Sequence, residues 1–73
     1  MLELTNARAG DSHTGIACIC DLTRNGIVIG IVDLTSAGEA QVTLYKQIIH
    51  AVVEEFLQEE GYTVATISKH GKQ

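Results

Sequence analysis

The chain has 73 residues, a formal net charge of −4, and 45% hydrophobic and 19% charged residues. This length fits one small domain, residues 1–73, whose core leaves little net stability unless oligomerisation, metals or disulfides add to it. The five Lys and Arg residues are scattered, so nucleic acid is an unexpected partner, because phosphate binding needs clustered positive charge. No apolar run reaches the roughly 18–20 residues that span a bilayer, and residues 1–9 do not resemble a signal peptide. We therefore expect a cytoplasmic protein without membrane contact.

The first predicted element is a short strand at residues 1–5, followed by a polar connecting loop at residues 6–14. Residues 10–15 hold an Asp, a Ser and a His, the residue types of a nucleophile with its base. Neighbours in one loop cannot usually point at one another as a catalytic triad does. We interpret the loop as a connector, and ligand binding by it is the alternative.

A β-hairpin is predicted at residues 15–34, because two apolar runs flank Asn25-Gly26. A two-residue type I′ turn needs positive φ at both positions, which Asn and Gly tolerate. This turn predicts that Arg24 pairs with Ile27 beside it. It predicts three further pairs along the strands: Leu22 with Ile29, Cys20 with Ile31, and Cys18 with Asp33. Paired residues point to the same face of a sheet.

Both faces of this predicted hairpin are largely apolar. One face carries Ile16, Cys18, Cys20, Leu22, Ile27, Ile29 and Ile31, and we assign the helix to it. The opposite face carries the candidate self-association residues, which are Ala17, Ile19, Val28, Val32 and Leu34. An exposed apolar patch of this size usually marks an interface. We therefore expect a homodimer or a higher oligomer.

One long amphipathic helix is predicted over residues 37–60. Ser36 is its expected N-cap, and Glu39 completes a capping box. Gly61 is placed to be the left-handed residue after the helix. Apolar residues recur at steps of three and four, as an amphipathic helix requires: Val42, Leu44, Tyr45, Ile48, Ile49, Val52, Val53, Phe56 and Leu57.

Residues 62–68 are predicted to be the last strand, and residues 69–73 a frayed tail. The element order β-β-β-α-β predicts an α+β fold, a four-stranded mixed sheet of order 3-2-1-4 with the helix packed on one face. This topology is similar to the front half of ribonuclease-H-like folds. The last predicted strand holds no acidic residue, so metal-dependent nuclease chemistry is not expected.

Acidic residues crowd the end of the predicted helix. Each such charge costs about 0.3–1 kcal/mol near the negative end of the helix dipole. An unfavourable local arrangement of this kind is often kept where it serves a function. The cluster is either a solvated end that aids solubility or a docking surface for a basic partner. We take its four members as candidate partner-binding residues: Glu54, Glu55, Glu59 and Glu60.

Cys18 and Cys20 are two residues apart on one predicted strand, a poor geometry for a mutual disulfide. We interpret them as buried, reduced thiols, as expected in the cytoplasm. Together with His13 they would supply three zinc ligands, and a fourth is missing. No metal and no cofactor are expected.

These features favour a small, acidic, non-enzymatic module that dimerises and binds another protein as an inhibitor or regulator. Chains of this kind are used as inhibitors or antitoxins by phages, plasmids and other mobile elements. One alternative is a small enzyme with the loop at residues 11–14 placed at a subunit interface. The other is a nucleic-acid-binding regulator whose dimer gathers the basic residues Arg8, Arg24, Lys69 and Lys72.

Overall fold

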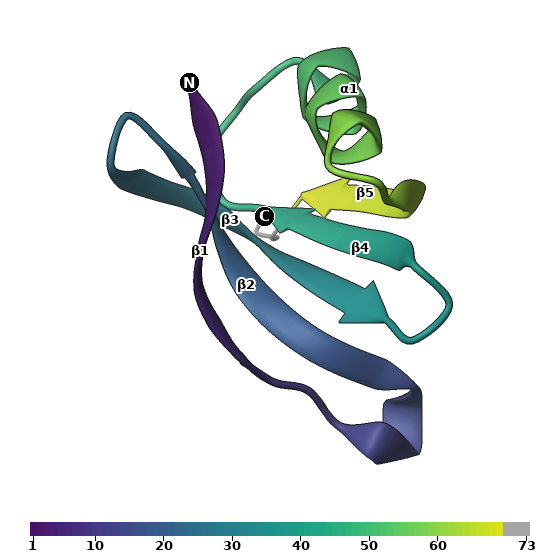
Figure 1. Ribbon diagram of the computed structural model, residues 1–73. Helices are drawn as coiled ribbons and strands as arrows, with labels where there is room; N and C mark the ends of the chain where they lie inside the picture. The colour runs from purple at the N-terminus through teal and green to yellow at the C-terminus, as the bar shows by residue number, and fades with distance from the viewer. Residues whose placement is uncertain (70–73) are drawn as a thin grey trace.

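The computed structural model describes residues 1–69, which form a five-stranded sheet and one helix (Figure 1). A single 3-10 turn, η1, joins the first two strands. The elements are β1 (Leu2–Ala9), η1 (Ser12–Thr14), β2 (Ile16–Arg24), β3 (Ile27–Thr35), β4 (Glu39–Leu44), α1 (His50–Glu59) and β5 (Thr63–Lys69).

The strands lie in the sheet in chain order, β1-β2-β3-β4-β5. The first four pair antiparallel, and β5 runs parallel to β4 after the crossover through α1. The predicted class, α+β with a mixed sheet and one helix, is confirmed. The four-stranded sheet of order 3-2-1-4 is wrong, because an additional strand, β4, continues the meander and the crossover starts from it. The similarity to ribonuclease-H-like topology does not hold.

The hairpin turn is confirmed. Asn25 and Gly26 have φ of 53° and 82°, the positive values that a type I′ turn requires. Arg24 pairs with Ile27 next to this turn, as predicted.

Beyond the turn, a β-bulge in β3 changes the register by one residue. Thr23 pairs with Val28, whereas Leu22 pairs with Gly30, so Ile29 is the extra residue of the bulge. The carbonyl of Ile29 accepts a hydrogen bond from the backbone N–H of Tyr45, 2.8 Å away. The predicted pairs are therefore wrong, and the observed pairs are Leu22–Gly30, Cys20–Val32 and Cys18–Leu34.

This bulge moves part of the predicted self-association face into the core. Val32 and Leu34 are 0% and 5% exposed and belong to the core on the α1 side of the sheet. Ala17 and Val28 are exposed, and Ile19 is half-buried. Placing all five on one uncovered apolar face was wrong, because the bulge moves the side chains after Ile29 to the opposite face of the sheet from the one predicted.

The sheet face opposite α1 is mixed in character as a result. Ile31, predicted under the helix, pairs with Asp21 on one side and Thr43 on the other. Ile19 likewise has Asp33 as its neighbour on β3. An antiparallel sheet that alternates in this way can leave one face to water. The reason given for self-association through this face no longer applies, and self-association itself stays a prediction.

The predicted helix at residues 37–60 is too long at its start. Its first part forms β4, in which Ala40, Val42 and Leu44 are buried at alternate positions. Ser36 is not an N-cap. Instead, the hydroxyl of Thr35 accepts backbone hydrogen bonds in the β3–β4 turn.

The helix ends where it was expected to end. Gly61 has φ of 99°, and its N–H donates to the carbonyl of Gln58. The predicted strand at residues 62–68 is confirmed as β5, which begins and ends one residue later, at Thr63 and Lys69. The predicted frayed tail otherwise lies at residues 70–73, outside the described residues.

The core lies between the sheet and one side of α1. The helix contributes Val53 and Leu57, both 0% exposed, and the sheet contributes Leu22, Val32 and Val42. In Figure 1 the helix lies at one end of the sheet, beside β5. Met1 and Leu2, at the start of the chain, line a hollow together with residues of α1. The start of β1 therefore lies close to α1 on one side and to the hairpin turn on the other.

Candidate functional site

The four glutamates of the predicted acidic cluster are exposed near the end of α1. The last turn of the helix contains no basic residue, and none of the four forms an ion pair within residues 1–69. Their charges therefore face solvent beside the negative end of the helix dipole, which is an unfavourable local arrangement.

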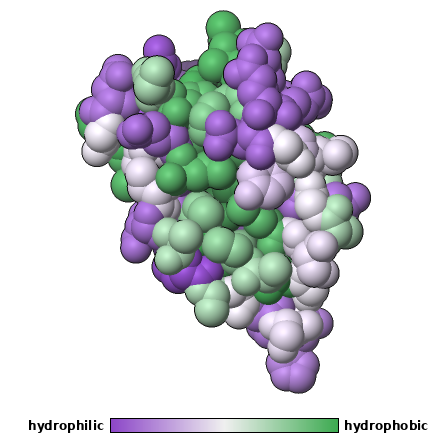
Figure 2. Space-filling view, viewed as in Figure 1, coloured by the Kyte–Doolittle hydropathy of each residue, from purple (hydrophilic) through white to green (hydrophobic). Residues whose placement is uncertain are grey.

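Three of these glutamates surround a hollow between α1 and the start of β1, with a volume of about 430 Å³. We name it the acidic hollow. Its apolar lining comes from both elements: Met1, Leu2, Val52 and Phe56. Its charged lining is Glu55, Glu59 and Glu60, whereas Glu54 does not line it. In Figure 2, hydrophobic side chains run down the middle of the face, and hydrophilic ones gather at the upper right over α1.

Helical periodicity explains this lining. Val52, Phe56 and Glu59 are spaced by four and three residues, so they lie along one side of the helix. Glu55 and Glu60 border the same strip. The acidic cluster could be found in the sequence, but its apolar neighbours on β1 could not, because they are more than 50 residues away along the chain.

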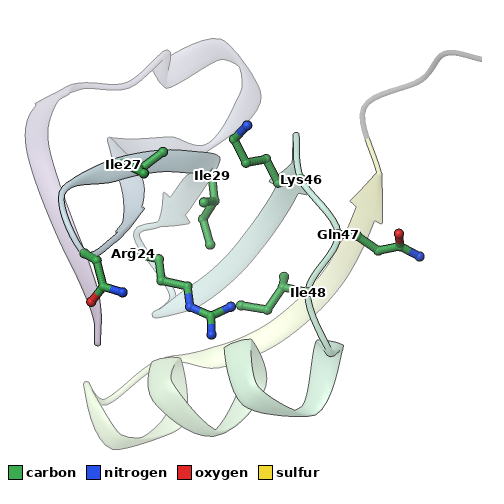
Figure 3. A pocket seen from close by; sticks show the side chains of 7 residues that line it. Arg24, Ile27, Ile29, Lys46, Gln47 and Ile48 are labelled. Atoms are coloured by element: carbon green, nitrogen blue, oxygen red, sulfur yellow. The ribbon is translucent and has the colours of Figure 1, made fainter.

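A second hollow, of about 330 Å³, lies between the hairpin turn and the segment that links β4 to α1 (Figure 3). We name it the basic hollow, because Arg24 and Lys46 line it and no acidic residue does. Arg24 reaches across it toward Ile48, while Gln47 points away. The remaining lining residues are Asn25, Ile27 and Ile29. Sequence reasoning missed this site, because it placed Lys46 inside the helix.

The two hollows adjoin at the start of β1. Leu2, which lines the acidic hollow, pairs with Arg24, which lines the basic one. The backbone N–H of Asn25 also donates to the carbonyl of Met1 at 3.3 Å. Large apolar side chains are exposed in both hollows, with Met1 at 86%, Ile27 at 59% and Val52 at 46%. One end of the molecule thus carries an apolar surface with a basic and an acidic side.

The loop at residues 10–15 is held as a turn. The carboxylate of Asp11 accepts a hydrogen bond from the N–H of His13 at 2.9 Å. Its carbonyl accepts one from the hydroxyl of Thr14, also at 2.9 Å. These bonds organise η1 from within, so the Asp11 carboxylate serves as a cap of the turn.

A polar cluster lies at the bulge of β1. Asn6, with φ of 53°, is in the segment where the pairing of β1 with β2 shifts. Its side-chain amide donates to Asp21 at 3.2 Å, and the guanidinium of Arg8 donates to the other carboxylate oxygen at 2.9 Å. The hydrogen bonds from Asn6 and Arg8 lower the pKa of Asp21 below its ordinary value. The negative charge of Asp21 is thus balanced by the positive charge of Arg8.

The two thiols lie side by side on the α1 side of β2. The sulfurs of Cys18 and Cys20 form no disulfide and are 3.8 Å apart, within hydrogen-bond distance of each other. Burial, together with the neighbouring thiol of Cys18, raises the pKa of Cys20. His13 is exposed on η1. Residues 1–69 contain no group of three or more His, Cys, Asp and Glu side chains that could hold a metal ion.

No family model, curated protein or solved structure matches this chain. Its function therefore has to be argued from the chemistry of its surface.

The basic residues named for nucleic-acid binding have different surroundings. Arg8 is paired with Asp21, and Arg24 lines the basic hollow. Lys69 ends β5, and Lys72 lies outside the described residues. Within residues 1–69, no helix is long and apolar enough to cross a membrane.

Proposed function

We propose that this protein is a small, non-enzymatic binding module that docks a basic, partly apolar segment of another protein in the acidic hollow. The observation that carries the proposal is the composition of this hollow. Three carboxylates without ion-pair partners in residues 1–69 stand around exposed apolar side chains. In this proposal the protein works in the cytoplasm as an inhibitor or regulator, of the kind that mobile elements encode.

The charges favour a cationic ligand. Glu55, Glu59 and Glu60 lie within six residues of one another at the end of α1. They repel one another. Each is also repelled by the negative end of the helix dipole, at a cost of about 0.3–1 kcal/mol when exposed. A Lys or Arg side chain bound there would offset both terms, and binding would exclude water and strengthen the attraction.

The apolar part of the hollow favours a ligand with hydrophobic side chains. Val52 and Met1 remain 46% and 86% exposed in the free protein, and Phe56 is half-buried beside them. Burial of such side chains contributes about 25 cal/mol per Å² removed from water. An apolar centre with a charged rim is the usual anatomy of a protein–protein contact.

Charge reversal in the hollow tests the proposal. The variant Glu55→Lys/Glu59→Lys/Glu60→Lys should lose at least tenfold in affinity for an amphipathic Lys/Leu peptide, measured by fluorescence anisotropy. Its melting temperature should stay the same or rise, because Lys interacts favourably with the end of a helix. Binding by the unmodified protein should weaken as salt rises, because exposed charges are screened within about 8–10 Å.

The single variant Glu59→Lys, inside the hollow, has a matched control in Glu54→Lys, which makes the same charge change on the same helix outside the hollow. The control should keep most of the affinity. Equal losses in Glu54→Lys and Glu59→Lys would show that overall charge, not the hollow, attracts the peptide. Undiminished, salt-independent binding by the triple variant would contradict the proposal.

A further inference from the structure

We infer that a second copy of this chain occupies the acidic hollow when no partner is bound, and that the two copies form a two-fold symmetric dimer. The inference rests on the proposed function, because it assigns a competing occupant to the same hollow. In the dimer, the basic hollow of each copy faces the acidic hollow of the other.

Charge complementarity carries the first step. One side of the surface presents Arg24 and Lys46, with no acidic residue in the lining of that hollow. The other side presents three glutamates, with no Lys, Arg or His in the lining of that hollow. The terminal amine of Met1 at its edge donates a hydrogen bond to the side chain of Asn25. Each hollow therefore has the charge that the other requires of a ligand.

The position of the two hollows carries the second step. In a two-fold dimer each copy uses the same patch, so a residue that contacts another across the interface is itself contacted in return. The hollows adjoin at Leu2, which pairs directly with Arg24. A two-fold axis through this junction superimposes basic on acidic hollows at both ends. Complementary sites on opposite ends of the molecule would instead give open chains.

The apolar side chains between the charges carry the third step. Met1, Ile27 and Val52 line the two hollows and are among the most exposed large hydrophobic residues of the described chain. Together they form the apolar centre that such an interface needs. The sheet face opposite α1 is less suited, because Asp21 and Asp33 interrupt its isoleucines.

The edges of the sheet are also poor sites for self-association. Both edge pairs, β1–β2 and β4–β5, contain a register shift. Bulges in edge strands hinder pairing with the edge of another sheet. The surface with the two hollows is therefore the one that the structure favours for a second copy, and partner binding should separate the dimer.

A charge exchange between two variants tests this arrangement. One variant carries Arg24→Glu/Lys46→Glu, and the other carries Glu55→Lys/Glu59→Lys. Each should sediment as a monomer at about 10–100 µM, where the unmodified protein is a dimer. An equimolar mixture should sediment as a dimer, because both contacts are attractive again in the mixed pair. Glu39→Lys, on an exposed residue at the start of β4, should leave the dimer intact.

The inference would be overturned if the unmodified protein were a monomer over this concentration range. It would also be overturned if the mixture stayed monomeric although both variants melt like the unmodified protein. Peptide binding separates this result from the proposed function. Arg24→Glu/Lys46→Glu keeps its acidic hollow, so it should bind the Lys/Leu peptide more tightly than the dimeric protein does. Peptide binding by a monomeric unmodified protein would refute the dimer alone. If the unmodified protein is a dimer but the monomeric variant Arg24→Glu/Lys46→Glu binds no peptide, the docking function alone is refuted.

Discussion

At the scale of single residues, Asp21 shows how a charged side chain is accommodated on an otherwise half-apolar sheet. The bulge in β1 and the positive φ of Asn6 place an amide and a guanidinium on its two carboxylate oxygens. Hydrogen bonds to an ionised carboxylate favour its charged form. Asp21 therefore ties the edge strand to its neighbour.

Because the folded pKa of Asp21 lies below its ordinary value of 3.8, its contribution to stability is present above that pH. The contribution should disappear as the pH falls through the lower pKa of the folded state. Asp21→Asn should thus lower the melting temperature at pH 7, and the difference from the unmodified protein should shrink as the pH falls below 3.8.

Arg8→Ala should reproduce this behaviour, because it removes the partner of the same ion pair. The double variant should lose little more than either single variant. A difference between Asp21→Asn and the unmodified protein that is the same at pH 7 and in acid would show that the ion pair does not stabilise the fold.

At the scale of the elements, the bulge at Ile29 decides which residues of β3 are buried. It is held by the N–H of Tyr45 and made possible by Gly30, where a Cβ atom would lie 2.5 Å from the carbonyl oxygen of Thr43. A strand with one extra residue exposes the opposite set of side chains beyond that point.

Two valines on this strand test the bulge. Val32 is 0% exposed, whereas Val28 is 41% exposed, although plain alternation places both on one face. Val32→Lys should cost about 3 kcal/mol or more, because it buries a charge without a partner. Val28→Lys should change the free energy of unfolding by no more than about 0.5 kcal/mol. Similar costs in urea unfolding would contradict the register.

The turn before β4 provides another test at this scale. The Thr35 hydroxyl accepts hydrogen bonds from the N–H groups of Ala37 and Glu39, at 3.3 and 3.1 Å. Thr35→Ala should cost about 0.5–1.5 kcal/mol. Ser36→Ala should cost much less, whereas a helix capped at Ser36 requires the opposite order. Thermal unfolding of the two variants distinguishes a turn from a helix start.

At the scale of the whole molecule, charge is distributed unevenly although the net charge is modest. The surface formed by α1, the start of β1 and the hairpin turn carries cations on one side and carboxylates on the other. Such an arrangement attracts a complementary surface and aligns it. The docking and dimer proposals both depend on this pattern, which only the folded chain creates.

The sequence alone determined the features that depend on neighbouring residues. Asn25-Gly26 specified its turn, Gly61 specified the end of the helix, and the glutamates before Gly61 placed an acidic cluster beside it. In each case the conformational preference of one or two residues decides the outcome. The last strand also followed from its own β-branched residues.

The tertiary structure decided the features that depend on distant partners. Residues 39–44 alternate polar and apolar side chains as a strand does, although Ala40 and Leu44 also have helical spacing. They form β4, to which β3 and β5 supply hydrogen bonds on its two sides. The bulge at Ile29 likewise depends on the N–H of Tyr45 from the end of β4. Both hollows join segments far apart in sequence, so no local pattern could reveal them. Long-range pairing overrides local periodicity because each strand gains its hydrogen bonds only from its neighbours.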